Sequence, residues 1–238
     1  MSKLASDTAM VMAAGMGKRM RPLTASQPKP LVRVAGKPLI DHTLDRLGAA
    51  GIGKAVVNVH YLADALEAHL GERSCPAVTI SDERDQLLET GGGMVKAQGL
   101  LPDPFFCLNS DNIWLDGPQD AFADLSQRWD PAIMDALLLV VPHARAVNFN
   151  GLGDFHLSPE GRIARRKADR IAPFIYTGIQ IVSHRLLRDS NVEKFSTNIL
   201  WNRALEEGRL FGVSFTGTWF EVGTPDSIRP TEDALQRG

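Results

Sequence analysis

Residues 10–31 contain the pattern that most restricts the fold and the chemistry of this chain. They read MVMAAGMGKRMRPLTASQPKPL. The apolar run that ends at Ala14 predicts a buried strand, and Gly15 and Gly17 predict a turn directly after it. Small residues let backbone N–H groups approach a ligand, and four cations follow within fifteen residues, namely Lys18, Arg19, Arg21 and Lys29. This combination indicates a polyphosphate site.

The distribution of charge favours a small anionic ligand. Residues 1–40 hold seven Lys or Arg and one acid, whereas the remaining 198 residues hold 19 bases and 27 acids, for a net charge of −2. A nucleic-acid-binding domain would be basic overall, so we expect no nucleic-acid partner. The alternative is a solvated basic N-terminus, which does not explain why the cations interleave with Gly and Pro.

Two better-known glycine motifs do not fit. A Walker loop needs a glycine five positions before its Gly-Lys pair and Ser or Thr after it, but Met12 and Arg19 stand at those places. A dinucleotide fingerprint needs a third glycine where Met20 stands, which disfavours a nicotinamide oxidoreductase.

Strand-like and helix-like segments alternate along the chain. The predicted strands are Ala9–Ala14, Ala55–His60, Ala77–Ser81, Phe105–Asn109, Ala136–Pro142, Gly153–Leu157, Ile175–Val182 and Leu210–Phe215. The predicted helices are Asp41–Ala50, Leu62–Leu70, Gly92–Leu101, Ala121–Trp129, Asn198–Glu207 and Pro225–Arg237. This alternation predicts an α/β fold with a Rossmann-like, doubly wound, mostly parallel mixed sheet, which binds ligands at the carboxyl ends of its strands.

The sequence also bounds the domain organisation and the setting. Residues 1–238 are expected to form a single domain, with 143–175 as a candidate inserted sugar-binding lobe or flap. Cys75 and Cys107 give neither a metal spacing nor a disulfide framework, and Cys107 is expected to be a buried thiol. No stretch approaches eighteen apolar residues, so we expect a cytoplasmic protein without a membrane partner.

Two acidic residues follow predicted strands or turns. Asp111 comes just after the run Phe105–Asn109, where a carboxylate can hold a divalent cation over phosphates; the alternative is an Asx-turn. Glu221 stands between an aromatic pair and a turn in which Thr224 and Pro225 predict a helix start. It could supply a second carboxylate, or it could be a helix-terminus charge.

Three glycine-containing segments remain. Gly91, Gly92 and Gly93 precede the helical residues 94–101, which indicates a close approach by a base or a sugar, with a plain flexible loop as the alternative. Segments 151–155 and 176–179 place a glycine beside polar groups suited to sugar hydroxyls, or they are ordinary strand edges or bulges. The six histidines show no metal spacing, and no Gly-x-Ser-x-Gly elbow is present.

In this order the segments resemble the sugar-1-phosphate nucleotidylyltransferases over roughly residues 10–235. The family opens with a glycine turn, an Arg, a Pro-Leu-Thr and a Pro-Lys-Pro, as 15–19, 22–24 and 28–30 do here. The resemblance implies transfer of a nucleotidyl group from an NTP to a sugar 1-phosphate, with Mg²⁺ as cofactor and pyrophosphate as the second product. It further implies a nucleotide-diphospho-sugar transferase fold and a monomer or small homo-oligomer.

The resemblance also implies a role for each site residue. Arg19 and Lys29 are the catalytic cations, on the β/γ-phosphates and near the α-phosphate, and Asp111 and Glu221 are the metal ligands. The nucleotide is expected to contact Ala14, Gly15, Met16, Gly17, Glu89, Gly92 and Asn109. The sugar is expected to face Asp154, Thr177 and Gly178.

Two departures from the family pattern affect these roles. Most members have Asp where Glu221 stands, and the Glu-Lys-Pro segment that grips the sugar phosphate is missing, with Arg165, Arg166 and Lys167 as candidate substitutes. Within the family the chain is most similar to the short N-acetylmuramate-1-phosphate uridylyltransferases of peptidoglycan recycling, which implies UTP as the nucleotide. The alternatives are a mannose-1-phosphate guanylyltransferase and a catalytically dead nucleotide-binding regulator on the same fold.

Overall fold

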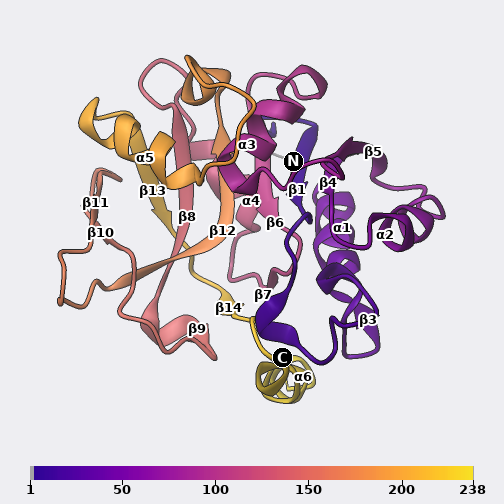
Figure 1. The fold of residues 1–238 in the computed structure, drawn as a ribbon. Coiled ribbons are helices and arrows are strands. Elements are labelled where there is room, and N and C mark those ends of the chain that lie inside the picture. Colours follow the sequence, from indigo (N-terminus) through magenta and orange to yellow (C-terminus); the bar gives the residue numbers. More distant parts are fainter. Residues whose placement is uncertain (1–2, 238) are drawn as a thin grey trace.

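A nine-stranded mixed sheet forms the centre of the computed structural model, which describes residues 3–237 (Figure 1). Four strands are parallel neighbours: β6 (Phe105–Asn109), β1 (Thr8–Met12), β4 (Lys54–Val59) and β5 (Ala77–Asp82). On the other side, β12 (Phe174–Val182) runs antiparallel to both β6 and β8 (Ala136–Pro142), and β13 (Leu210–Ser214) lies parallel to β8. The hairpin of β10 (Phe155–Leu157) and β11 (Ile163–Arg165) continues the sheet beyond β12.

Helices cover both faces of this sheet. Successive side chains along a strand point to opposite faces, so each strand contributes to two separate cores. Val11 and Leu108 belong to the core under α1 (Leu39–Ala50), α2 (Ala63–Leu70) and α4 (Ala121–Arg128). Met10 and Cys107 belong to the core under α3 (Glu89–Ala97) and α5 (Thr197–Glu206). The predicted doubly wound α/β fold is therefore confirmed.

A third, smaller core lies beneath the carboxyl edge of the main sheet. Here β14 (Thr218–Phe220) pairs with β7 (Ile113–Leu115) and β9 (Ala146–Val147), and α6 (Ile228–Leu235) packs at the foot of the molecule in Figure 1. The remaining elements are β2 (Arg33–Val34), β3 (Lys37–Pro38) and 3-10 helices at 18–20, 29–31, 98–100, 143–145, 184–187 and 225–227. Within residues 3–237, no helix is long and apolar enough to cross a membrane.

Each strand expected from the sequence exists, with ends that match or shift by one or two residues, but the helix predicted over Gly92–Leu101 needs correction. It is α3, which begins at Glu89 and ends at Ala97, so the three glycines 91–93 lie inside it and the alternative of a flexible loop is wrong. Residues 143–175 contribute β9 to the small sheet and β10, β11 and the start of β12 to the main sheet. Cys107 is buried as expected, and burial raises the pKa of its thiol to about 12.

A buried carboxylate directly before β8 joins the segment that follows β12 to the residue that precedes β13. Asp135 is 1 % exposed, and its oxygens accept hydrogen bonds from Arg185 Nε at 3.0 Å, Arg209 Nε at 2.6 Å and Arg188 Nη1 at 3.1 Å. Burial alone would raise the pKa of Asp135, but the hydrogen bonds and charges of Arg209 and Arg185 outweigh it and hold the pKa below its usual value.

We expect Asp135→Asn to lower the free energy of unfolding by about 2 kcal/mol at neutral pH, less than for a fully buried pair because the three arginines face water. A carboxyl with a lowered folded pKa stabilises the fold above its unfolded pKa of about 3.9, and this contribution disappears as the pH falls through the folded pKa. The difference between variant and wild type should therefore shrink in urea unfolding curves at about pH 3.

A surface pair provides the control for this comparison. Asp64 Oδ1 bonds to Nη2 of Arg84 at 2.6 Å, and the aspartate side chain is 97 % exposed. Asp64→Asn should cost less than about 0.5 kcal/mol at either pH. Equal stability of Asp135→Asn and wild type at neutral pH would contradict the structural role of Asp135.

Candidate active site

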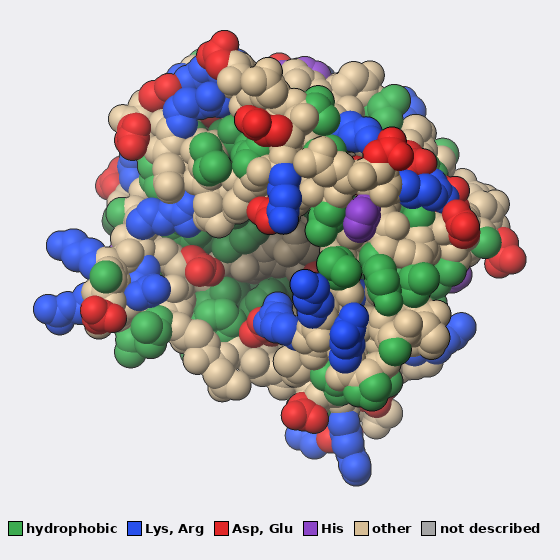
Figure 2. Space-filling view, viewed as in Figure 1, with side chains coloured by type: hydrophobic (Ala, Val, Ile, Leu, Met, Phe, Trp, Pro, Cys, Tyr) green, Lys and Arg blue, Asp and Glu red, His purple; other side chains and the backbone are tan. Residues whose placement is uncertain are grey.

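A cleft with a volume of about 700 Å³ opens where β1 and β6 end, and we call it the main cleft. Figure 2 shows it as a hollow in the middle of this face, with Lys and Arg side chains along its lower rim. Most of the predicted nucleotide and phosphate residues line it: Ala14, Gly15, Met16, Gly17, Arg19, Lys29, Glu89, Asn109 and Asp111. Its place at the carboxyl ends of parallel strands is the expected ligand site of such a sheet.

The glycine turn forms one wall of the main cleft. Gly17 has φ +59°, and a Cβ atom on it would lie 2.9 Å from Cβ of Lys29 and 3.0 Å from Cγ2 of Thr24. Only glycine fits there without strain, and its missing side chain allows Lys29 to pack against the turn. A Cβ on Gly15 would meet nothing within 4 Å, so this backbone is open to a ligand.

A chain of buried polar groups, missed in the sequence analysis, holds the turn from behind. Asn58 Oδ1 accepts hydrogen bonds from the N–H groups of Ala13 at 2.6 Å and Ala14 at 3.3 Å, so the N–H of Ala14 is already engaged. Asn58 Nδ2 donates to Oε1 of Glu83 at 2.7 Å, and the N–H of Leu88 donates to Oε2 at 3.1 Å. The glycine turn and the segment that carries Glu89 are thereby tied to one carboxylate.

We expect Glu83→Gln to raise the KM for the nucleotide about tenfold, because one orphaned buried donor costs roughly 1–3 kcal/mol. Both carboxylate oxygens of the fully buried Glu83 accept a hydrogen bond. In glutamine one of these oxygens becomes an N–H₂ group, which cannot accept, so one of the two donors loses its partner. The KM for the sugar phosphate should stay unchanged, since no sugar-side residue bonds to Glu83.

Steady-state kinetics with each substrate varied in turn, with thermal unfolding alongside, measure this effect. The exposed neighbour Asp85 is the matched control, and Asp85→Asn should behave as wild type. A Glu83→Gln variant that changed the KM for the nucleotide and the KM for the sugar phosphate equally would contradict the prediction that Glu83 supports nucleotide binding alone.

Lys29, predicted to act near the α-phosphate, and Asp111, predicted to be a metal ligand, are in contact. Lys29 begins a 3-10 helix between two buried prolines, and its Nζ donates to Oδ2 of Asp111. The side chains are 15 % and 29 % exposed, so both reach the main cleft while being shielded from bulk water. The lysine comes from the 3-10 helix at residues 29–31, and the aspartate follows the end of β6.

A second pair stands beside the first. Nη1 of Arg19 lies 3.5 Å from Oε1 of Glu221, which follows β14. Thr224 is the N-cap and Pro225 the first residue of the next 3-10 helix, as expected. Asp111 and Glu221 both line a small adjoining space of about 200 Å³, which we call the carboxylate hollow.

The donor set of the carboxylate hollow fits Mg²⁺. No group of three or more His, Cys, Asp and Glu that could hold a metal occurs between residues 3 and 237. Mg²⁺, however, usually takes one or two carboxylates and completes its shell with substrate phosphates and water. Asp111 and Glu221 provide that number of carboxylates, and their lysine and arginine partners offset the repulsion between the two negative charges.

The predicted sugar residues form the opposite wall of the carboxylate hollow, where β12 has a register shift between Tyr176 and Gln180. Gly178 has φ +82°, and a Cβ on it would lie 2.6 Å from Nδ2 of Asn109. Asp154 Oδ2 accepts a bond from the N–H of Tyr176 at 2.9 Å. Thr177 is 1 % exposed and its hydroxyl donates to the carbonyl of Leu139 at 2.8 Å, so this hydroxyl is not a free donor to a sugar.

The glycines of α3 allow another segment of the protein to pack closely against the helix, whereas the sequence indicated a close approach by a ligand. A Cβ on Gly92 would lie 1.9 Å from the carbonyl oxygen of Glu193, and one on Gly91 would lie 2.3 Å from the ring of Phe195. This packing brings Lys194 and Ser196 into the lining of the main cleft, where Glu89 and Thr90 also lie. Gly92 lines neither the main cleft nor the carboxylate hollow.

The fold, the glycine turn and the paired cations and carboxylates define a nucleotidyltransferase. Residues 8–165 match the nucleotidyl transferase family, and the chain belongs to this family. It is 45% identical over 236 residues to the N-acetylmuramate alpha-1-phosphate uridylyltransferase of Caulobacter vibrioides, covering 97% of this chain and 98% of that protein. The N-acetylmuramate alpha-1-phosphate uridylyltransferase of Neisseria meningitidis serogroup B is 35% identical, covering 91% of this chain and 93% of that protein.

A more distant relative and a solved structure with the same fold extend the comparison. Mannose-1-phosphate guanyltransferase beta-B of Xenopus laevis is 29% identical over 231 residues, covering 91% of this chain and 61% of that protein. The inositol-1-phosphate CTP transferase from T. maritima has the same fold, with a TM-score of 0.77, 18% identity and coverage of 98% of this chain and 96% of that chain. The predicted family, sugar-1-phosphate nucleotidyltransferases, and the predicted enzyme class are thus confirmed.

Proposed function

We propose that this chain transfers the uridylyl group of UTP to N-acetylmuramate 1-phosphate, giving UDP-N-acetylmuramate and pyrophosphate with Mg²⁺ as cofactor. The observation that carries the proposal is the contact between Lys29 and Asp111 at the end of β6, beside Arg19 and Glu221. The choice of substrates is supported by the 45% identity to the Caulobacter vibrioides enzyme over nearly the whole length of both chains. A cytoplasmic monomer or small homo-oligomer acting in peptidoglycan recycling is part of the same proposal.

The proposed chemistry needs positioned charge and no general base. A phosphate dianion of the sugar attacks the α-phosphorus of UTP in line, and pyrophosphate leaves on the opposite side. The open backbone at Gly15 and the cation of Arg19 hold the β- and γ-phosphates, and Lys29 neutralises the charge that grows at the α-phosphate. Asp111 and Glu221 would hold Mg²⁺, which supplies further neutralisation of the phosphates when bound.

A substrate panel tests the proposal. The protein is incubated with Mg²⁺, each of UTP, GTP, dTTP, CTP and ATP, and one of N-acetylmuramate, N-acetylglucosamine or mannose 1-phosphate. Pyrophosphate release and the mass of the sugar nucleotide are measured. UDP-N-acetylmuramate is the expected main product. GDP-mannose as the main product would replace the proposal by a guanylyltransferase, and nucleotide binding without pyrophosphate release would indicate a regulator.

A further inference from the structure

A third space of about 320 Å³, the aromatic hollow, adjoins the main cleft. Asn109, Thr90 and Ser196 line both spaces, so the two communicate there. The walls of the aromatic hollow include Phe155, Tyr176 and Trp201, with ring centroids of Tyr176 and Trp201 4.8 Å apart. None of Arg19, Lys29, Asp111 and Glu221 lines it, so it lies away from the phosphate groups.

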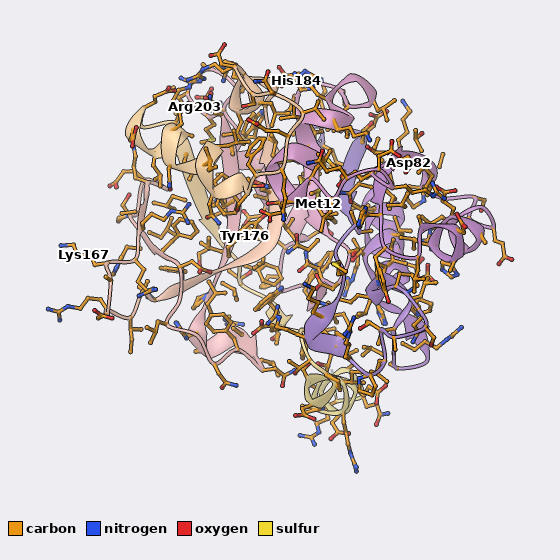
Figure 3. All side chains as sticks on the ribbon, viewed as in Figure 1. Met12, Asp82, Lys167, Tyr176, His184 and Arg203 are labelled. Atoms are coloured by element: carbon orange, nitrogen blue, oxygen red, sulfur yellow. The ribbon has the colours of Figure 1, made fainter. Side chains whose placement is uncertain are left out.

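Among the three basic residues that could replace the missing family lysine, the structure distinguishes one. Lys167 is exposed, and Figure 3 shows it at the outer edge of the molecule, pointing away from Tyr176. The guanidinium of Arg166 donates to the carbonyl oxygens of Gly153 at 3.1 Å and of Lys167 and Arg170 at 3.2 Å, so it is used within its own loop. Arg165 lines the aromatic hollow, and no other Lys or Arg does.

Arg165 is held in place but is not neutralised. Its Cζ lies 5.0 Å from the ring centroid of Phe155 and 5.6 Å from that of Trp201, and its Nε and Nη2 donate to Oδ1 of Asn202 at 3.2 and 3.0 Å. Burial lowers the pKa of Arg165, and the charge of Asp154 partly offsets this. In the part of the chain that the structure describes, Arg165 forms no salt bridge, and three of its five N–H donors remain unused.

We infer that Arg165 binds a carboxylate on the sugar, and that this enzyme is therefore selective for acidic sugar 1-phosphates. A half-buried guanidinium without a salt-bridge partner favours an anion, and its planar fork of donors matches a carboxylate. The inference rests on the proposed function, since N-acetylmuramate carries such a carboxylate on its lactyl ether, away from the 1-phosphate. Tyr176 and Trp201 offer an apolar wall to the acetyl group, and Asp154, which lines both hollows, can accept sugar hydroxyls.

A substrate pair that differs only in the lactyl group tests this inference. In Arg165→Gln we expect kcat/KM for N-acetylmuramate 1-phosphate to fall about 10–100-fold, the size of one hydrogen-bonded charge contact, and kcat/KM for N-acetylglucosamine 1-phosphate to stay within twofold. Arg165→Lys should fall between wild type and Arg165→Gln, since it keeps the charge and loses the fork. The exposed Lys167 is the control, and Lys167→Gln should leave both values unchanged.

Each other outcome has a definite meaning. An equal loss for both sugars in Arg165→Gln would make Arg165 a structural or phosphate-binding residue and overturn the inference. Failure of wild type to form UDP-N-acetylmuramate would overturn the proposed function instead. Arg165 is then tested with glucuronate and glucose 1-phosphates and the nucleotide that wild type uses, and an equal rate with both would overturn selectivity for acidic sugars as well.

Discussion

Replacement of Lys29 by alanine should lower kcat by about 10²–10³-fold, the loss usual for one preorganised donor to a transition state. The amine of Lys29 is mostly shielded from water and touches Asp111, so its charge acts in a medium less screening than bulk solvent. Phosphoryl transfer needs little else from the protein than position and charge, and among the cations that line the main cleft Lys29 is the one in contact with Asp111. The KM values should change less than kcat, because the charge matters most as the reaction proceeds.

The measurement is pyrophosphate release at saturating substrates, with circular dichroism to confirm that the variant is folded. Lys37 is the matched control, because it forms a comparable ion pair with Asp45 at 2.7 Å on the surface, where both side chains are nearly half exposed. Lys37→Ala should keep the wild-type kcat. Near-normal turnover of Lys29→Ala would remove this lysine from the chemistry.

The meeting of Lys29 with Asp111 could be predicted, because it depends on the order of strands. Asp111 comes just after β6, Lys29 lies in the segment that follows β1 and the glycine turn, and parallel neighbours such as β1 and β6 end at the same edge of the sheet. The roles of Asn58 and Glu83 could not be predicted in this way. Their hydrogen bonds join segments 45 and 25 residues apart, and no local pattern encodes that contact. A polar residue inside the apolar run Ala55–Val59 was the available signal.

The errors in the predicted secondary structure have the same cause, because the residues near a segment in sequence do not show which distant segments it contacts. The strands β7, β9 and β14 have two or three residues each, too few to show a period, and they form only because distant segments supply their partners. The predicted helix began only at Gly92, and a flexible loop was the alternative for the three glycines since glycine is a poor helix former, yet packing of Gly91 and Gly92 against Phe195 and Glu193 needs their missing side chains. Tertiary contact overrides propensity at this place.

A prediction of β11 as a strand would have helped to decide whether Arg165 or Arg166 lines the aromatic hollow. Successive side chains on a strand point to opposite faces, so only one of the two can reach a given hollow. The run Ile163–Arg165 is too short and too mixed to indicate a strand by itself. Pairing with β10 makes it one, and the alternation then assigns Arg165 to the aromatic hollow.

Replacement of Asp111 by asparagine should reduce turnover on the order of 10³-fold, because one change removes a proposed metal ligand and the partner of Lys29. The amide keeps the shape of the side chain but not its charge, so thermal stability should change little at this partly exposed site. Binding of Mg²⁺ should weaken independently of turnover. Titration calorimetry of Mg²⁺ into the protein with a non-hydrolysable UTP analogue measures this directly.

The exposed acid Asp226 is the control for Asp111, since it lies close in sequence to Glu221 but outside the lining of the cleft and its hollows. Asp226→Asn should bind Mg²⁺ as wild type does. Because Lys29 and Asp111 are in contact and are proposed to act on the same phosphate, their losses should not add. The double variant should be about as slow as the slower single variant, and losses that multiplied in full would mean that the two side chains act at separate places.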